Sequence, residues 1–152
     1  MSVHFLRREL WIPRPRAEVF EFFSQARNLE RITPPLVGFH VLTPEPIQMK
    51  PGALIEYRLK IRGIPARWIT EITGWNPPFE FTDVQRKGPY KTWNHAHRFY
   101  EVNGGTRMLD EVLYELPFGP LGDVVHSLLV RRDVESIFAF RNTTISTLFP
   151  AT

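Results

Sequence analysis

The fold of this chain is most constrained by one alternating stretch in its second half. The run Trp93-Asn94-His95-Ala96-His97-Arg98-Phe99 and a second run from Leu109 to Leu116 flank the sequence Asn103-Gly104-Gly105-Thr106. A glycine-containing turn between two alternating runs predicts a β-hairpin. This stretch therefore predicts two paired strands of an antiparallel sheet.

The two faces of this hairpin differ sharply in character. With the two glycines at its tip, Phe99 lies opposite Asp110 and His97 lies opposite Val112. Successive side chains of a strand point to opposite faces, so one face is apolar with a few polar groups embedded in it. That face carries Trp93, His95, His97, Phe99, Asp110, Val112, Tyr114 and Leu116. An apolar wall with a few polar groups is what a small-molecule pocket needs.

Alternation and turn residues predict further strands along the chain. The chain has fourteen prolines among 152 residues, a share nearly double the usual ~5%. Most of them fall between the alternating runs and so mark where elements end. Strands are expected at 3–12, 38–43, 53–62, 66–75, 79–86, 92–102 and 106–116. In the run at 53–62 the inward positions are Ile55, Tyr57, Leu59 and Ile61. Two short helical segments are expected, one that has Pro15 in its first turn and Val19, Phe20, Phe22 and Phe23 on its apolar face, and a second turn at 28–32.

After Pro117 the apolar spacing becomes helical. The stripe consists of Leu121, Val124, Val125, Leu128, Leu129, Val134, Phe138, Ile145 and Leu148 or Phe149. A helix of nearly thirty residues needs a large packing surface, so we expect this stripe to face the sheet. The element order predicts an α+β helix-grip fold: a curved seven-stranded antiparallel sheet wrapped around the C-terminal helix, with two short helices after the first strand.

Composition narrows the class of protein. The 152 residues, 43% hydrophobic and 23% charged, predict one globular domain spanning 1–152. The net charge of +3 includes no basic run of five or more residues, so no nucleic-acid partner is expected. We read no apolar run long enough for a membrane span. The absence of cysteine excludes disulfides and thiolate sites, and fits a cytoplasmic location.

A series of short motifs carries a family resemblance across nearly the whole chain. In order they are Asn28-Leu29, Thr33-Pro34-Pro35, Phe81-Thr82-Asp83-Val84-Gln85, Gly88-Pro89-Tyr90, the 93–99 run, Gly105-Thr106, the 110–114 run, Pro117-Phe118-Gly119-Pro120-Leu121-Gly122, Arg132 and the 137–141 run. The combination resembles the helix-grip (SRPBCC) superfamily of START lipid-transfer domains, birch-pollen allergens and aromatic polyketide cyclases. Within this superfamily, the motifs resemble most specifically the bacterial cyclase/dehydrase-like branch. The resemblance implies a ligand cavity but no particular reaction.

We therefore interpret the chain as a non-catalytic protein that binds a hydrophobic small molecule, lipid-like or aromatic, between the sheet and the C-terminal helix. Neither a cofactor nor a metal is expected, and the oligomeric state stays open. The candidate binding residues are Tyr57, Leu59, Trp68, Phe81, Asp83, Gln85, Trp93, His95, His97, Phe99, Asp110, Val112, Tyr114 and Leu128.

Three alternatives stay open. A cyclase or dehydratase would use His95, His97 and Asp110 for proton transfer and Tyr114 to stabilise an enolate oxygen. In that case, if the turn at 88–90 keeps the register, Asp83 and His95 face each other. A metal site would use the two histidines with Asp110, and His126 as a fourth ligand. A protein-interaction module would instead have a filled core whose polar groups satisfy one another.

Overall fold

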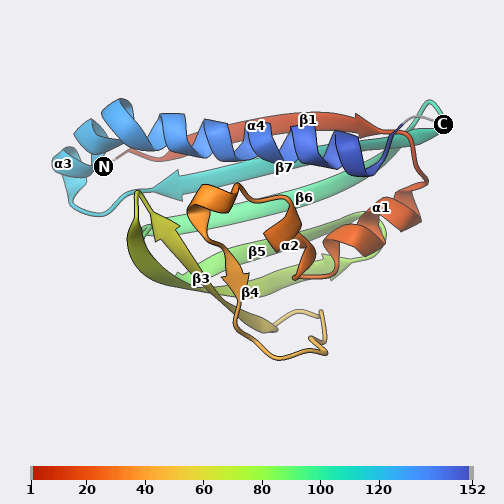
Figure 1. Ribbon diagram of the computed structural model, residues 1–152, viewed down its shortest axis with the longest axis horizontal. Coiled ribbons are helices and arrows are strands. Elements are labelled where there is room, and N and C mark those ends of the chain that lie inside the picture. The colour runs from red at the N-terminus through yellow and green to blue at the C-terminus, as the bar shows by residue number, and fades with distance from the viewer. Residues whose placement is uncertain (1, 151–152) are drawn as a thin grey trace.

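The computed structural model describes residues 2–150 and shows an antiparallel sheet with helices across one face (Figure 1). The seven strands of this part of the chain are β1 (His4–Ile12), β2 (His40–Val41), β3 (Leu54–Ile61), β4 (Ile64–Asn76), β5 (Glu80–Lys87), β6 (Thr92–Val102) and β7 (Gly105–Glu115). Their order in the sheet is β1-β7-β6-β5-β4-β3-β2. Every pair is antiparallel, so the predicted sheet is confirmed.

The helical elements follow β1 or end the chain. The first group is α1 (Arg16–Phe23), α2 (Asn28–Arg31) and the 3₁₀ turn η1 (Pro35–Val37). The second group is α3 (Gly119–Val125), the π-helical segment η2 (His126–Val130) and α4 (Arg131–Leu148), which form one continuous helix. Both groups lie on the same face of the sheet, where they enclose its concave side (Figure 1). The predicted α+β helix grip is therefore confirmed.

The register predicted for the β6–β7 hairpin is wrong by two residues. The turn is formed by Asn103 and Gly104, which both have positive φ values, of 52° and 75°. Asn-Gly is the preferred pair for such a turn because both residues tolerate left-handed backbone. His97 consequently lies opposite Asp110 instead of Val112. Because the error is an even number of residues, the division of side chains between faces is retained.

Gly105 therefore belongs to β7 and not to the tip of the hairpin. A Cβ atom at this position would lie 2.5 Å from the carbonyl oxygen of Ile12 and 2.6 Å from the ring of Trp11. The glycine is thus required by the close approach of β1 to β7. The prediction that it forms the tip of the hairpin is wrong.

The predicted orientation of the C-terminal helix is right for its second half and wrong for its first half. Val134, Phe138 and Ile145 are buried against the sheet, as expected. Leu121 and Leu128, however, are 65% and 70% exposed. Gly122 and His126 are the buried residues of this half.

Two features account for that error. The apolar side chains of α3–η2 lie on the side of the helix that faces away from the sheet, whereas His126 packs against His4 and Tyr114 of the strands. The π-helical turn of η2 also changes the phase of the helix, since it has more residues per turn than an α-helix. Among residues 2–150, none of the helices combines the length and hydrophobicity that a bilayer-spanning segment needs.

Candidate functional site

A cavity of about 540 Å³ lies between the concave face of the sheet and the helices. This volume is within the range of small-molecule sites. Strands β3 to β6 form its floor, where the apolar side chains are Ile55, Tyr57, Leu59, Trp68, Ile72, Phe81 and Trp93. The inward alternation predicted for β3 is confirmed, since Ile55, Tyr57 and Leu59 are all buried. Helix α4 closes the opposite side with Val134 and Phe138.

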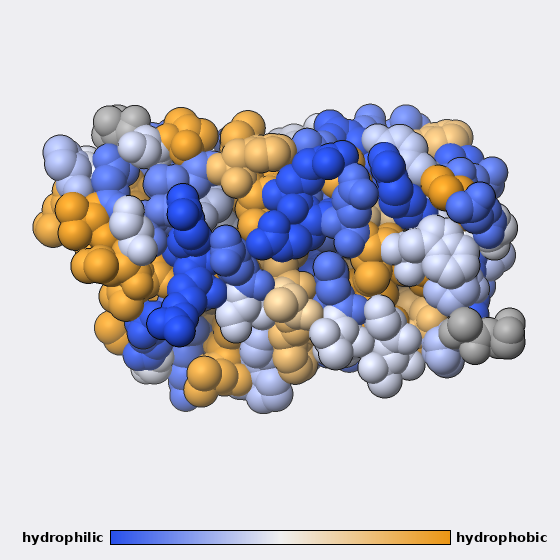
Figure 2. Space-filling view, turned by 90° about the horizontal axis from the view of Figure 1, so that it is seen from above, coloured by the Kyte–Doolittle hydropathy of each residue, from blue (hydrophilic) through white to orange (hydrophobic). Residues whose placement is uncertain are grey.

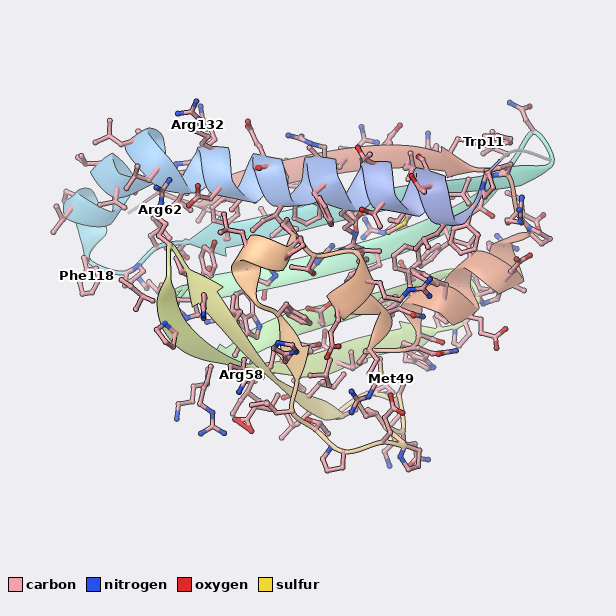
Figure 3. The ribbon with its side chains drawn as sticks, viewed as in Figure 1. Trp11, Met49, Arg58, Arg62, Phe118 and Arg132 are labelled. Carbon is pink, nitrogen blue, oxygen red and sulfur yellow. The ribbon has the colours of Figure 1, made fainter. Side chains whose placement is uncertain are left out.

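One side of the cavity is formed by the loop between β3 and β4, by η1 and by the start of α4. Arg62, in the β3–β4 loop, donates two hydrogen bonds to the carboxylate of Asp133 on α4, at 2.9 and 3.0 Å. Figure 3 shows Arg62 reaching from this loop to the helix. Leu36, on η1, lines the same side and is 91% exposed. This side therefore combines an ion pair with an exposed apolar rim.

The polar wall of the cavity begins with Asp83 on β5. The backbone of Asp83 pairs with His95, which confirms the neighbours expected from the sequence. Its side chain instead accepts a hydrogen bond from Nε2 of His97, diagonally across the strands, at 2.6 Å. The hydroxyl of Thr70 donates a second bond to Asp83, at 3.2 Å.

The second half of this wall is organised around Asp110 on β7. Oδ1 of Asp110 accepts from Nε2 of His95 at 2.8 Å and from Nη2 of Arg141 at 3.2 Å. The guanidinium of Arg141 also lies over the rings of Phe23 and Phe138, 5.3 and 5.5 Å from their centroids. We call Asp83, His95, His97, Asp110 and Arg141 the pocket cluster.

The electrostatics of the pocket cluster follow from its burial. Burial and the neighbouring His95 lower the pKa of His97 to about 4, although the carboxylates of Asp83 and Asp110 oppose this shift. Burial alone would raise the pKa of Asp110, but Arg141 and His95 outweigh it and hold that pKa below its usual value. Burial alone would also raise the pKa of Asp83. Its hydrogen bonds with His97 and Thr70 and its electrostatic interactions with the His97 and His95 imidazoles outweigh burial, so the pKa of Asp83 is lowered.

At neutral pH the pocket cluster therefore contains two carboxylates, one guanidinium and a neutral His97. Because His97 donates from Nε2, its Nδ1 atom carries a lone pair. This buried Nδ1 has no hydrogen-bond partner among residues 2–150 and lies 3.5 Å from Oδ1 of Asp110. Tyr57, on the cavity floor, stays a phenol because burial and the charge of Asp83 raise its pKa.

The sequence-predicted binding residues divide into two groups. Those that line the cavity are Tyr57, Leu59, Trp68, Phe81, Asp83, Trp93, His95 and His97. Asp110 lies behind this lining, where it holds His95 and Arg141. The structure thus brings eight of the predicted residues together around one space.

The remaining predicted residues lie elsewhere. Gln85 hydrogen-bonds both backbone groups of Tyr90 and so holds the β5–β6 turn. Phe99 and Val112 are buried in the apolar core. Tyr114 is hydrogen-bonded to His126 at 2.7 Å, outside the cavity lining. Leu128 is 70% exposed and does not contact the cavity.

Arg141 is the main residue of the site to which the sequence analysis assigned no role. It is buried and lines the cavity. Its position, seven residues after Val134, places it on the buried stripe of α4. A charged residue at a buried-stripe position was the signal available in the sequence, because a buried charge needs a partner.

Three side chains of the pocket cluster have the composition of a metal site. Ligand atoms of Asp83, His95 and His97 lie within 4.8 Å of one another. Imidazole nitrogens and a carboxylate are ligands that zinc accepts. The set differs from the one considered from the sequence, because Asp83 replaces Asp110 and His126 is engaged with Tyr114.

Comparison with known proteins agrees with this architecture. Residues 12–140 match the family model described as "Polyketide cyclase / dehydrase and lipid transport". No functionally curated protein matches the chain significantly. The likeness is thus to a family whose description spans both enzymes and lipid carriers.

Solved structures share the fold over most of the chain. TTHA0849 from Thermus thermophilus is 20% identical, with a TM-score of 0.70 over 95% of this chain and 99% of that one. Ara h 8.0201 is 16% identical, with a TM-score of 0.66 over 96% and 99%. A nucleoside-diphosphate sugar epimerase from Corynebacterium glutamicum is 25% identical over 92% of this chain but only 28% of its own, with a TM-score of 0.66.

Proposed function

Because the chain belongs to the polyketide cyclase/dehydrase and lipid-transport family, we propose that it binds a hydrophobic small molecule, lipid-like or aromatic, in the cavity between the sheet and α4. The observation that carries this proposal is a mainly apolar cavity of about 540 Å³ that has the pocket cluster at one wall and the Arg62–Asp133 ion pair at its rim. A filled core, as the interaction-module alternative requires, would leave no such space beside His97.

The apolar part of the cavity suits a ligand with an extended hydrocarbon or ring surface. The rings of Trp68 and Trp93 meet edge to face at 5.3 Å, and Tyr90 contacts both. Aromatic walls of this kind offer large contact areas with little loss of side-chain entropy on binding. Burial of apolar ligand surface contributes roughly 25 cal/mol per Å².

The polar wall orients the ligand. Asp83, His95 and His97 line the cavity, and Arg141 contributes a guanidinium beside them. A ligand with one polar end satisfies these groups while its apolar part contacts the aromatic floor. The expected ligand is therefore amphipathic, with a single polar end placed against the pocket cluster.

A blocked-pocket variant tests this proposal. Ile137 lines the cavity from α4, whereas Ala139, two residues later, is exposed and does not. We expect the fluorescent fatty acid cis-parinaric acid to bind the wild type saturably and Ile137→Trp at least about tenfold more weakly, because the indole fills ligand space. Ala139→Trp is the matched control and should bind like the wild type. Absence of saturable binding to the wild type, or equal affinity in both variants, would contradict the proposal.

A second candidate function is proton-transfer catalysis of the cyclase or dehydratase type. It is favoured by the two histidine–carboxylate hydrogen bonds at the cavity wall, at 2.6 and 2.8 Å. A neutral His97 held by Asp83 has the protonation state of a general base. Tyr114 is not placed to take part, since its hydroxyl is bonded to His126.

Binding and catalysis are separated by what happens to the bound compound. If the site is catalytic, a polyketide-like compound that binds the wild type is converted, and His97→Ala keeps its affinity but loses conversion. If every compound that binds is recovered unchanged, the protein is a carrier and the catalytic candidate fails.

A further inference from the structure

The first half of the C-terminal helix presents an unusual amount of apolar surface. The apolar patch consists of Phe118, Leu121, Val124, Val125, Leu128 and Leu129, whose exposed fractions lie between 38% and 79%. From Leu121 onward these residues are spaced by three or four positions, so they share one side of the helix. Figure 2 shows hydrophobic side chains gathered at this end of the molecule.

Two arginines continue the same side of the helix. Arg131 and Arg132 follow Leu128 by three and four positions, and both are exposed. Neither forms an ion pair with any residue between 2 and 150, in contrast to Arg62 nearby. In Figure 3, Arg132 projects from the upper side of the helix at this end, and Phe118 lies below the start of α3. The patch therefore combines exposed leucine and valine with unpaired positive charge.

The apolar patch also adjoins the ligand cavity. Val130 directly follows Leu129 and lines the cavity, as does Asp133 one turn later. The Arg62–Asp133 ion pair and the exposed Leu36 lie on this same side of the cavity. Anything that covers the apolar patch would therefore lie next to this side of the cavity, where Leu36 forms the exposed apolar rim.

We propose that α3 and η2 dock on the surface of an anionic lipid bilayer. The apolar patch enters the boundary between headgroups and acyl chains, and Arg131 and Arg132 bind lipid phosphates. An amphipathic helix with leucine on one side and arginine beside it binds membranes in this way. Anionic lipids attract such arginines because their charge is complementary.

Docking in this orientation gives the cavity direct access to the bilayer. This step rests on the proposed function, because it assumes that the cavity holds an amphipathic ligand. The ligand would then exchange between the cavity and the lipid without crossing bulk water, whereas the docking itself depends only on the patch and its arginines.

Vesicle flotation tests the docking. We expect the wild type to bind phosphatidylcholine vesicles that contain about one-third phosphatidylserine, and to bind pure phosphatidylcholine at least tenfold more weakly, since each surface arginine contributes about 1 kcal/mol on anionic lipid. Leu128→Asp should lower binding to the anionic vesicles about tenfold or more, because it loses apolar burial. Leu54→Asp is the matched control, since Leu54 is 57% exposed but lies on β3.

Equal binding by Leu128→Asp and Leu54→Asp, or no binding of the wild type to anionic vesicles, would overturn the proposal. So would a concentration-dependent dimer that Leu128→Asp dissociates in the absence of vesicle binding, because the patch would then be an interface between two copies. The double variant Arg131→Gln/Arg132→Gln should lose the preference for anionic lipid, and an unchanged preference would also count against it.

The cis-parinaric acid titration separates this proposal from the ligand-binding function. In the absence of vesicles, Leu128→Asp should bind the probe like the wild type. Conversely, Ile137→Trp should bind vesicles normally while it loses the probe. Vesicle binding without probe binding would defeat the proposed function and leave the docking intact, whereas the reverse result would defeat only the docking.

Discussion

Two polar clusters lie along the inner face of β7, four residues apart, and they differ in charge and in access to the cavity. The pocket cluster is built on Asp110, which binds His95 and Arg141. The second cluster, which we call the distal cluster, consists of His4, Tyr114 and His126. In it the Tyr114 hydroxyl is 2.7 Å from Nε2 of His126, whose ring stacks on that of His4 at 3.3 Å.

The pocket cluster is ionic, whereas burial favours the neutral forms of His126 and Tyr114 in the distal cluster. Burial and the proximity of His4 lower the pKa of His126, and burial raises the pKa of Tyr114. The pocket cluster instead keeps two carboxylates charged beside one guanidinium, and four of its five members line the cavity. Burial of polar side chains on one strand face thus does not by itself mark a binding site. The proposed binding site differs from the distal cluster in having a charged network that lines the cavity.

The largest effect that distinguishes the clusters is expected at Asp110. Asp110→Asn leaves the buried guanidinium of Arg141 without its counter-charge, which should cost about 3–5 kcal/mol of unfolding free energy. The measurement is urea denaturation at pH 7. Glu111→Gln is the control, because Glu111 pairs with Arg98 on the other face of the sheet in a partly exposed ion pair worth about 1 kcal/mol or less. Similar losses in both variants would mean that the pocket cluster is not an ionic network.

The next effect is a pH dependence centred on His97. Its pKa is about 4 in the folded protein, against about 6.5 when unfolded, so between these values the unfolded chain binds more protons. Stability therefore falls as the pH drops from 6.5 to 4, by about 3 kcal/mol from this one group. The depressed pKa values of Asp83 and Asp110 reduce stability only below about pH 4, where these carboxyl groups take up protons in the unfolded chain before they do in the folded protein.

Urea denaturation at several pH values measures this dependence. In His97→Gln the loss between pH 6.5 and pH 4 should shrink by about 3 kcal/mol relative to the wild type. The contribution of His126 is common to both proteins and cancels in the comparison. An unchanged pH profile would show that folding does not lower the pKa of His97, which would contradict the electrostatics described for the pocket cluster.

The smallest effect is expected in the distal cluster. Tyr114→Phe removes one hydrogen bond to His126 without leaving a charge unpaired, so it should cost about 1 kcal/mol by urea denaturation. The affinity for cis-parinaric acid should be unchanged, since Tyr114 does not line the cavity. A large drop in probe affinity would erase the distinction between the two clusters.

How much of this site could be predicted from the sequence depended on whether each interaction is local in the sequence or joins distant segments. The faces of β6 and β7 were predicted correctly because side-chain direction alternates strictly with residue number. The pairing of His97 with Asp110 was missed because it depends on which two residues form the turn, and both Asn103-Gly104 and Gly104-Gly105 are acceptable by sequence. The diagonal bond from His97 to Asp83 depends in addition on sheet twist and side-chain rotamers.

The sequence by itself determined the order of elements, the antiparallel sheet, the long terminal helix and the polar residues of the inner face, since these follow from local periodicity and turn chemistry. Only the tertiary structure decided which polar residues meet the cavity and which apolar ones meet solvent. Arg141 reaches Asp110 because α4 crosses β7. Leu128 is exposed because it lies on the side of the helix that faces away from the sheet, opposite the buried His126. Both outcomes depend on how segments that are distant in the sequence pack together, and residue spacing within one segment does not predict that packing.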